Sequence, residues 1–289
     1  MQLMNKSKMT ELTADVIVGH NPSLVSLPDI YFRLEETIAS PSSSLNDAAE
    51  IIHSDPALAA RLLRIANSAF YSHPTEINTV ERALMLIGTR QLKELTMATV
   101  VIDMFKSENI SFITMREFWE HSIACGIACR VIAIYLGRRD YEQYYLAGLF
   151  HALGRLILFT EFPEITEQTT ALSIEKKIPL YEAENEIMGF NHAHVGYALL
   201  RNWKLPLAQQ QAVHFQHGPQ TDIPMSILPE CIHVADWMVN GLSIGSSGEQ
   251  YVPPLIDAFW QRLNIPESAL GELIDQTDRQ YQEVSGLFL

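Results

Sequence analysis

The chain has 289 residues, of which 47% are hydrophobic and 19% are charged. This balance suits a globular protein with a substantial core and argues against a disordered chain. Twenty basic residues against 34 acidic ones give a net charge of −14, which repels nucleic-acid phosphates and anionic lipids. We therefore expect neither nucleic acid nor a membrane surface as a partner.

The N-terminal sequence MQLMNKSKMT lacks the apolar core of a signal peptide. A cytoplasmic location is therefore expected, and Cys125, Cys129 and Cys231 are predicted to be free thiols. The longest apolar runs, 123–136 and 146–159, contain histidine, arginine or glycine. These runs predict buried helices rather than membrane spans.

Helical periodicity of apolar residues runs along most of the chain. Residues 28–40 predict one helix, and residues 40–72 predict two. The second of these begins at Asp55-Pro56, with Asp55 as its N-cap and Pro56 as its first residue. Strand-like alternation is nowhere convincing, so the chain is predicted to be all-α. The later helices are expected at about 116–136, 142–160, 163–177, 179–188, 191–203, 206–217, 224–242, 253–263 and 266–287.

Residues 77–105 predict a helix pair that is broken at Gly88-Thr89. The glycine would end the first helix and the threonine would cap the second. A helix, a glycine turn and a second helix also make the DNA-binding helix–turn–helix. The net charge of −14 and the scarcity of basic residues in this stretch disfavour that interpretation.

Five polar residues are unusual because each occupies an apolar or helix-end position. They are His121, His151, His192, His217 and Asp236. Imidazole and carboxylate are the ligands expected for Zn, Mn or Fe, so a shared metal site is one interpretation. Each residue taken alone is explained as well by a buried side chain whose hydrogen bonds are satisfied.

A second cluster competes for the metal. His121, Cys125 and Cys129 follow one another at intervals of four residues and share one helix face. They would form a thiolate-rich site. The preferred interpretation is that small cysteines let another helix approach closely.

Further evidence comes from three stretches that occur in a fixed order. They are IIHSDPALAARLLRIANSAFYS with INTVERALMLIGTRQLKEL, then FWEHSIACGIACRVIA with LAGLFHALGRLIL, then HAHVGYALLRNWKLP with AVHFQHGP. Together they resemble the HDOD branch of the HD superfamily of metal-dependent phosphohydrolases. The resemblance runs from about Pro22 to Pro219, which is most of the chain.

The resemblance implies an all-α, multi-helical HD-like fold. An N-terminal helical lobe at about 20–110 would pack on an HD-type lobe that begins at about 111. The HDOD domain would span 20–220, and residues 221–289 would add C-terminal helices that complete the HD-like lobe.

HD enzymes gather a first histidine, an adjacent His-Asp pair, further histidines and a late aspartate around one or more metals. Matched motif by motif, these positions are His121, His151, His192, His217 and Asp236. Two positions depart from the pattern. Ala152 replaces the aspartate of the pair, and Gln216 replaces the first histidine of a later His-His pair. Alanine cannot bridge two ions about 3.5–4 Å apart, so we expect one weakly held divalent ion (Zn, Mn or Fe) or none, and no catalytic residue.

The preferred interpretation is a stand-alone, non-catalytic HDOD module for signalling and regulation. It would act through a signalling protein partner or a small nucleotide-like ligand. The alternative is a metal-dependent phosphohydrolase with a reduced metal site. A third interpretation is a sensor that binds a small molecule in the old cleft. Arg155, one turn after His151, could meet an anionic group there or serve as a surface cation.

Overall fold

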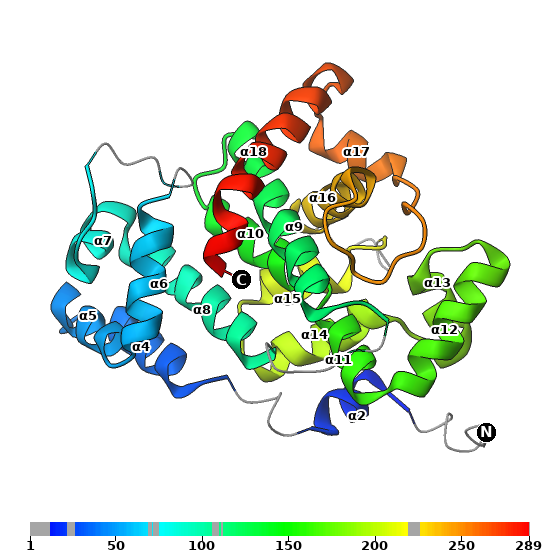
Figure 1. Cartoon of the computed structure of the whole chain (residues 1–289), viewed down its shortest axis with the longest axis horizontal. Coiled ribbons are helices and arrows are strands. Elements are labelled where there is room, and N and C mark those ends of the chain that lie inside the picture. The colour runs from blue at the N-terminus through cyan, green and yellow to red at the C-terminus, as the bar shows by residue number, and fades with distance from the viewer. Residues whose placement is uncertain are drawn as a thin grey trace. The chain divides into compact units, whose positions relative to one another are not determined.

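The chain folds into α-helices joined by turns and longer loops, such as the loop between α16 (Leu228–Leu242) and α17 (Asp257–Leu263) (Figure 1). The computed structural model describes residues 12–21, 27–68, 71, 75–105, 110, 112–218 and 226–288. Within these residues there is one short 3₁₀ helix, Glu267–Ala269, and no strand, which confirms the all-α prediction. No helix in the described part of the chain is both long enough and apolar enough to span a bilayer.

Contacts between Cα atoms divide the chain into two units. The larger unit comprises Met1–Ser26 and Glu108–Gly271, and the smaller unit comprises Leu27–Ser107 and Glu272–Leu289. The smaller unit contains α4 (Asp29–Ala39), α5 (Leu45–His53), α6 (Pro56–Ala66), α7 (Val80–Ile87), α8 (Thr89–Phe105) and most of α18 (Leu270–Phe288).

The start and end of α6 follow directly from its sequence. Asp55 caps the helix, because its Oδ1 accepts hydrogen bonds from the backbone N–H groups of Ala57 and Leu58 at 3.0 Å each. This confirms the predicted cap. At the other end, the Asn67 side chain pairs with both backbone groups of Ile77 at 2.7 Å. Asn67 therefore fastens the following segment to the end of α6.

The break between α7 and α8 lies at Gly88, as the sequence indicated. Gly88 has a φ of +100°, a backbone conformation that favours glycine. Thr89 differs from the expectation, because it is the first residue of α8 rather than its cap. The glycine itself occupies the position before the helix.

The larger unit is built around α9 (Met115–Tyr135), which is buried on all sides from Ile123 to Ala133. Helices α10 (Tyr141–Phe150) and α16 (Leu228–Leu242) pack against it. The other helices of this unit are α2 (Ala14–Gly19), α11 (Leu153–Glu161), α12 (Pro163–Lys176), α13 (Leu180–Met188), α14 (His192–Asn202), α15 (Leu207–His214) and α17 (Asp257–Leu263). Most of these helices begin and end within a few residues of the predicted bounds.

The contact between α9 and α10 is unusually close. A Cβ atom added at Gly148 of α10 would lie 2.5 Å from the Cys125 carbonyl oxygen and 2.8 Å from Cys129 Sγ. Only glycine fits at such a distance. This supports the interpretation that small side chains on this face of α9 admit a neighbouring helix.

The single helix predicted over 142–160 is in fact two helices. α10 ends at Phe150, α11 begins at Leu153, and His151 and Ala152 form the turn between them. The turn directs α11 against α14 so closely that a Cβ at Gly154 would lie 2.0 Å from the His192 carbonyl oxygen. Both helices are buried on nearly all sides, so their apolar pattern continues across the turn and conceals it.

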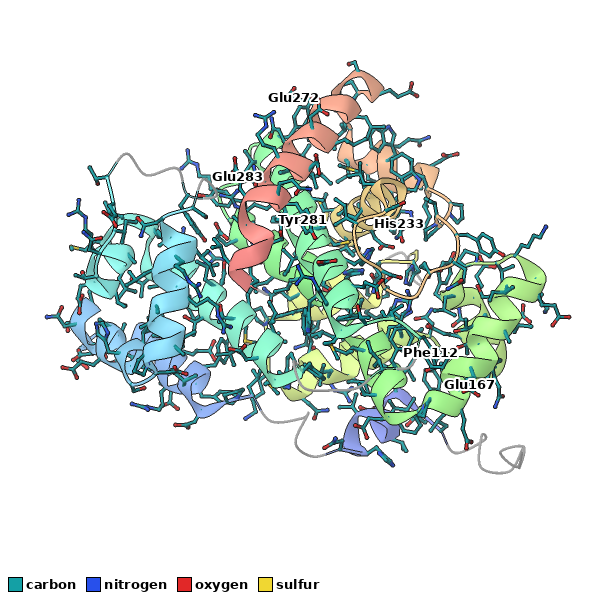
Figure 2. The ribbon with its side chains drawn as sticks, viewed as in Figure 1. Phe112, Glu167, His233, Glu272, Tyr281 and Glu283 are labelled. Atoms are coloured by element: carbon teal, nitrogen blue, oxygen red, sulfur yellow. The ribbon has the colours of Figure 1, made fainter. Side chains whose placement is uncertain are left out.

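The division into two units differs from the predicted lobes at the C-terminal end of the chain. Residues 272–289 belong to the smaller unit, whereas we expected them to complete the HD-like lobe. α18 carries one buried stripe, which includes Leu273, Tyr281 and Val284, and such a stripe does not reveal which partner covers it. Figure 2 shows Tyr281 on this helix, and it also shows His233 on α16.

Candidate functional site

Four side chains able to bind metal converge in the larger unit: His121, Cys125, His151 and Asp236. One ligand atom from each lies within 4.8 Å of the other three, and all four residues are buried. His121 Nε2 is 2.9 Å from Asp236 Oδ1 and 3.5 Å from Cys125 Sγ. His151 Nε2 is 3.5 Å from the same oxygen of Asp236. We call this set the four-residue cluster.

Packing of three segments creates the cluster. His121 and Cys125 are one turn apart on α9, so their side chains share a face. Asp236 comes from α16, and His151 comes from the turn that ends α10. Because α10 and α16 both pack on α9, residues far apart in the sequence meet at this face.

The hydrogen bonds of His151 show what the cluster can hold. His151 Nδ1 lies 2.7 Å from the Gly148 carbonyl oxygen, which only accepts hydrogen bonds. Nδ1 therefore carries a proton. The other ring nitrogen, Nε2, faces an oxygen of Asp236 in a buried site. A bound cation or a second ring proton between them would stabilise this arrangement.

The same hydrogen bond is the usual support of a metal-bound histidine. Such a ring donates its second N–H to a carbonyl or carboxylate, which fixes its orientation. Two imidazoles, a carboxylate and a thiol are also a sufficient donor set for one tetrahedral ion. The residues present therefore fit a single metal ion.

Burial and charge set the protonation of the cluster. Burial lowers the pKa of His121, against the opposing hydrogen bond to Asp236. Burial acts to raise the pKa of Asp236, but hydrogen bonds from His121 and His151 hold this pKa well below its usual value. Burial, followed by the charge of Asp236, raises the pKa of Cys125 well above its usual value. Without a cation, the cluster thus holds an ionised carboxylate and a neutral thiol.

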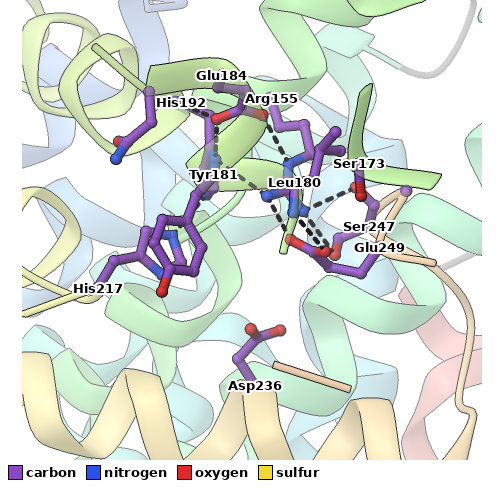
Figure 3. Close-up of polar contacts among 12 residues, drawn as sticks. Arg155, Ser173, Leu180, Tyr181, Glu184, His192, His217, Asp236, Ser247 and Glu249 are labelled. Carbon is purple, nitrogen blue, oxygen red and sulfur yellow. Dashed lines mark hydrogen bonds and ion pairs between the residues drawn. The ribbon is translucent and has the colours of Figure 1, made fainter. Parts of the chain in front are cut away.

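His192 and His217 form a separate pair, with their Nε2 atoms 3.0 Å apart. Glu184 orients His192, because its Oε2 lies 2.7 Å from His192 Nδ1. Tyr181 stacks on His217 with ring centroids 4.2 Å apart. Within the described residues, no third metal-binding side chain joins this pair at the spacing found in the four-residue cluster. Figure 3 shows the pair, with Asp236 facing toward it from α16.

Arg155 is only 2% exposed, so the surface position considered for it is wrong. Its Nη2 lies 2.8 Å from Glu249, and its Nε lies 3.4 Å from Glu184. Its Nη1 donates to the carbonyl and hydroxyl oxygens of Ser247 at 3.2 and 3.1 Å. The guanidinium is therefore paired with two carboxyl groups of the chain itself (Figure 3). We call Arg155, Glu184 and Glu249 the arginine cluster.

Ala152 and Gln216 both lie buried beside these groups. Ala152 is the residue before α11 and offers only a methyl group. The Gln216 amide donates to the carbonyl oxygens of His151 and Val213, at 2.9 and 3.1 Å. The amide nitrogen therefore holds the backbone of the turn, whereas the amide oxygen, Oε1, is buried without a hydrogen-bond partner. His233 adds to this support, because its Nδ1 lies 3.0 Å from the Gln216 carbonyl oxygen.

Comparison with known proteins identifies the family. The model of the HDOD domain matches residues 24–219, about two thirds of the chain. The chain belongs to the HDOD family. A curated relative from Treponema pallidum (strain Nichols), an uncharacterized protein, is 24% identical over 214 residues. That match covers 74% of this chain but 41% of the relative, so this chain spans less than half of the relative's length.

Solved structures share the fold. An HDOD domain protein of unknown function from Geobacter sulfurreducens has a TM-score of 0.73 at 22% identity, over 95% of this chain and 98% of its own. A protein from Shewanella amazonensis SB2B, provisionally named a phosphohydrolase, has a TM-score of 0.72 at 21% identity, over 93% and 99% of the two chains. A protein from Marinobacter aquaeolei VT8, provisionally named a signal transduction protein, has a TM-score of 0.71 at 20% identity, over 91% of this chain and 59% of its own.

The HDOD fold brings the five predicted ligands together in two groups. His121, His151 and Asp236 meet in the four-residue cluster, and His192 pairs with His217. From the sequence we assigned Cys125 to packing. Its spacing of four residues from His121 was nevertheless a signal that the two side chains share a metal-binding face. Glu184 and Glu249 were missed, because a glutamate in a helix or loop carries no pattern that predicts burial.

Proposed function

We propose that this HDOD chain is a regulatory module without catalytic activity, which holds at most one divalent ion. It would act by binding a signalling protein or a small nucleotide-like ligand. The observation that carries the proposal is Ala152, a buried methyl group at the residue that directly follows His151. Two metal ions about 3.5–4 Å apart need an anionic bridge between them, and a methyl group supplies none.

The arginine cluster supports the same conclusion. An arginine that assists phosphoryl transfer must be free to meet the phosphoryl group of the substrate. Arg155 lies close to the four-residue cluster, since its charge acts on His121, but Glu184 and Glu249 already neutralise it. Its charge therefore stabilises the fold instead of attracting an anionic substrate.

The second candidate function is hydrolysis of a phosphate ester with one metal ion. The four-residue cluster favours it, because a single zinc can lower the pKa of a bound water to about 7. An enzyme of this kind must leave a ligand position open for water. Two imidazoles, a carboxylate and a thiolate would fill the tetrahedron, so this candidate ranks second.

Metal analysis combined with an activity assay tests the proposal. The purified protein is analysed by emission spectrometry and then incubated with nitrophenyl phosphomonoesters and phosphodiesters, with Zn, Mn or Fe added. We expect at most one ion per chain and no hydrolysis above that of a His151→Ala control. Two tightly held ions, together with chelator-sensitive turnover that the control lacks, would refute the proposal.

The partner is tested separately. The thermal unfolding midpoint is measured with nucleoside triphosphates and cyclic nucleotides, because a ligand that binds only the folded state raises it. Nucleic acid and membranes are not expected as partners, given the net charge of −14. An upward shift with one nucleotide would favour the small-ligand mode of action over the protein-binding one.

A further inference from the structure

We infer that Cys125 is a metal ligand whose thiolate supplies the negative charge that Ala152 does not. The four-residue cluster would then be a mononuclear site with two nitrogen, one sulfur and one oxygen ligands, suited to zinc. The inference rests on the single ion of the proposed function. It adds the role of the sulfur in balancing the charge of the ion, and the preferred metal.

The distances between ligand atoms are close to those of a tetrahedral site. Bond lengths of about 2.0–2.1 Å to nitrogen and about 2.3 Å to sulfur place tetrahedral ligand atoms about 3.3–3.6 Å apart. The distance from His121 Nε2 to Cys125 Sγ is 3.5 Å, and that from His151 Nε2 to Asp236 Oδ1 is also 3.5 Å. His121 Nε2 and Asp236 Oδ1 are closer, at 2.9 Å, and the remaining pairs lie within 4.8 Å. Small side-chain movements would therefore bring all four atoms onto one ion.

Charge balance identifies the role of the sulfur. A divalent ion bound by two neutral imidazoles and Asp236 alone leaves one uncompensated positive charge in a buried site, which is unfavourable. If the Cys125 thiol releases its proton to solvent on binding, two negative ligands balance the ion. The ring proton of His121 then moves from Nε2 to Nδ1, because Nε2 must offer its lone pair. The site becomes neutral without a carboxylate at position 152.

Cys129 provides an internal comparison, since it lies one turn further along the same helix and is equally buried. Its Sγ donates to the carbonyl oxygen of Cys231 at 3.5 Å, and it packs against Gly148. It is not part of the four-residue cluster. The structure thus separates the two cysteines of one face into a ligand and a packing residue.

The choice of metal follows from the donor set. Thiolate ligands select soft or borderline ions such as zinc, whereas oxygen-rich sites suit manganese and magnesium. A site with one sulfur and two nitrogens therefore prefers zinc and cobalt to manganese. A site with only oxygen and nitrogen ligands would discriminate less strongly between zinc and manganese.

Cobalt spectroscopy tests the inference without relying on activity. The full chain is stripped with a chelator, loaded with Co²⁺, and its absorption recorded, because a cobalt–thiolate bond gives a charge-transfer band in the near ultraviolet. We expect one cobalt per chain, a charge-transfer band, and loss of cobalt when zinc but not manganese is added. The band should vanish in Cys125→Ala and persist in Cys129→Ala.

Zinc affinity gives a second measurement. Loss of a ligand should weaken zinc binding by more than the roughly 10–100-fold typical for residues that support a ligand, whereas Cys129→Ala should change it little. If Cys125→Ala does not fold, the test compares the charge-transfer band of the wild type with the spectrum of Cys125→Ser, which should lack the band. A wild-type protein that binds no cobalt, or binds it without the band, overturns the inference, as does a band that survives in Cys125→Ala. Each result is independent of hydrolysis, on which the proposed function depends.

Discussion

The four-residue cluster and the arginine cluster are both buried in the larger unit, but they balance charge in opposite ways. In the arginine cluster, the chain supplies its own cation, and two carboxylates hold Arg155 from both sides. In the four-residue cluster, Asp236 is ionised and meets imidazole rings and a thiol, with no permanent cation in the set. The first arrangement is complete without a ligand. The second is complete only when a proton or a metal ion joins it.

This difference suggests a division of roles within one helical scaffold. An internal ion cluster that contains its own cation needs no ion from solution. An incomplete cluster changes its net charge when it binds an ion, and this change acts on the helices that surround it. We expect substitutions in the two clusters to separate along these lines.

The largest effect is expected for Arg155→Ala. Removing the guanidinium leaves Glu184 and Glu249 buried without their partner, which should lower the free energy of unfolding by about 3–5 kcal/mol. Urea denaturation measures it. The control is Arg116→Ala, since Arg116 is 72% exposed and pairs with Glu120 on the same helix, and its loss should cost about 0.5 kcal/mol or less. Similar losses for both variants would contradict the assigned role of the arginine cluster.

Ala152→Asp should have the next largest effect, and it would be conditional on metal. The new carboxylate is buried, so it should destabilise the metal-free protein by about 1–3 kcal/mol or more. Zinc should restore stability, and metal content should exceed that of the parent. Ala147→Asp is the control, because Ala147 is equally buried on α10 but outside the cluster. Rescue of both variants by zinc would mean that the effect is not specific to the site.

The sequence was sufficient for the helical class, the family and most helix ends, because periodicity and caps such as Asp55 are local signals. It failed at the turn between α10 and α11, where complete burial on both sides hides the break. It also failed for Glu249, because only the folded chain brings this residue to Arg155. The role of Cys125 depends on the approach of α16, which spacing along α9 does not show.

Zinc itself should stabilise the wild-type protein by an intermediate amount. An ion at a hundred times its Kd adds about 2.7 kcal/mol to the stability of the folded state. The thermal unfolding midpoint should therefore rise by several degrees with zinc and return on addition of a chelator. Cys125→Ala should lose this shift, while Arg155→Ala should keep it. A shift lost equally in both variants would show that the two clusters do not act separately.

The smallest effect is expected for Ser247→Ala. The Ser247 hydroxyl lies 3.1 Å from Arg155 Nη1, but the backbone carbonyl of the same residue accepts from the same nitrogen at 3.2 Å. Because that carbonyl and both carboxylates remain, the variant should lose only about 0.5–1.5 kcal/mol, as for one ordinary hydrogen bond. Its zinc-dependent shift should equal that of the wild type, since no ligand of the four-residue cluster has changed. Urea denaturation with and without zinc measures both quantities. A loss as large as that of Arg155→Ala would mean that the hydroxyl, rather than the two carboxylates, holds the guanidinium in place.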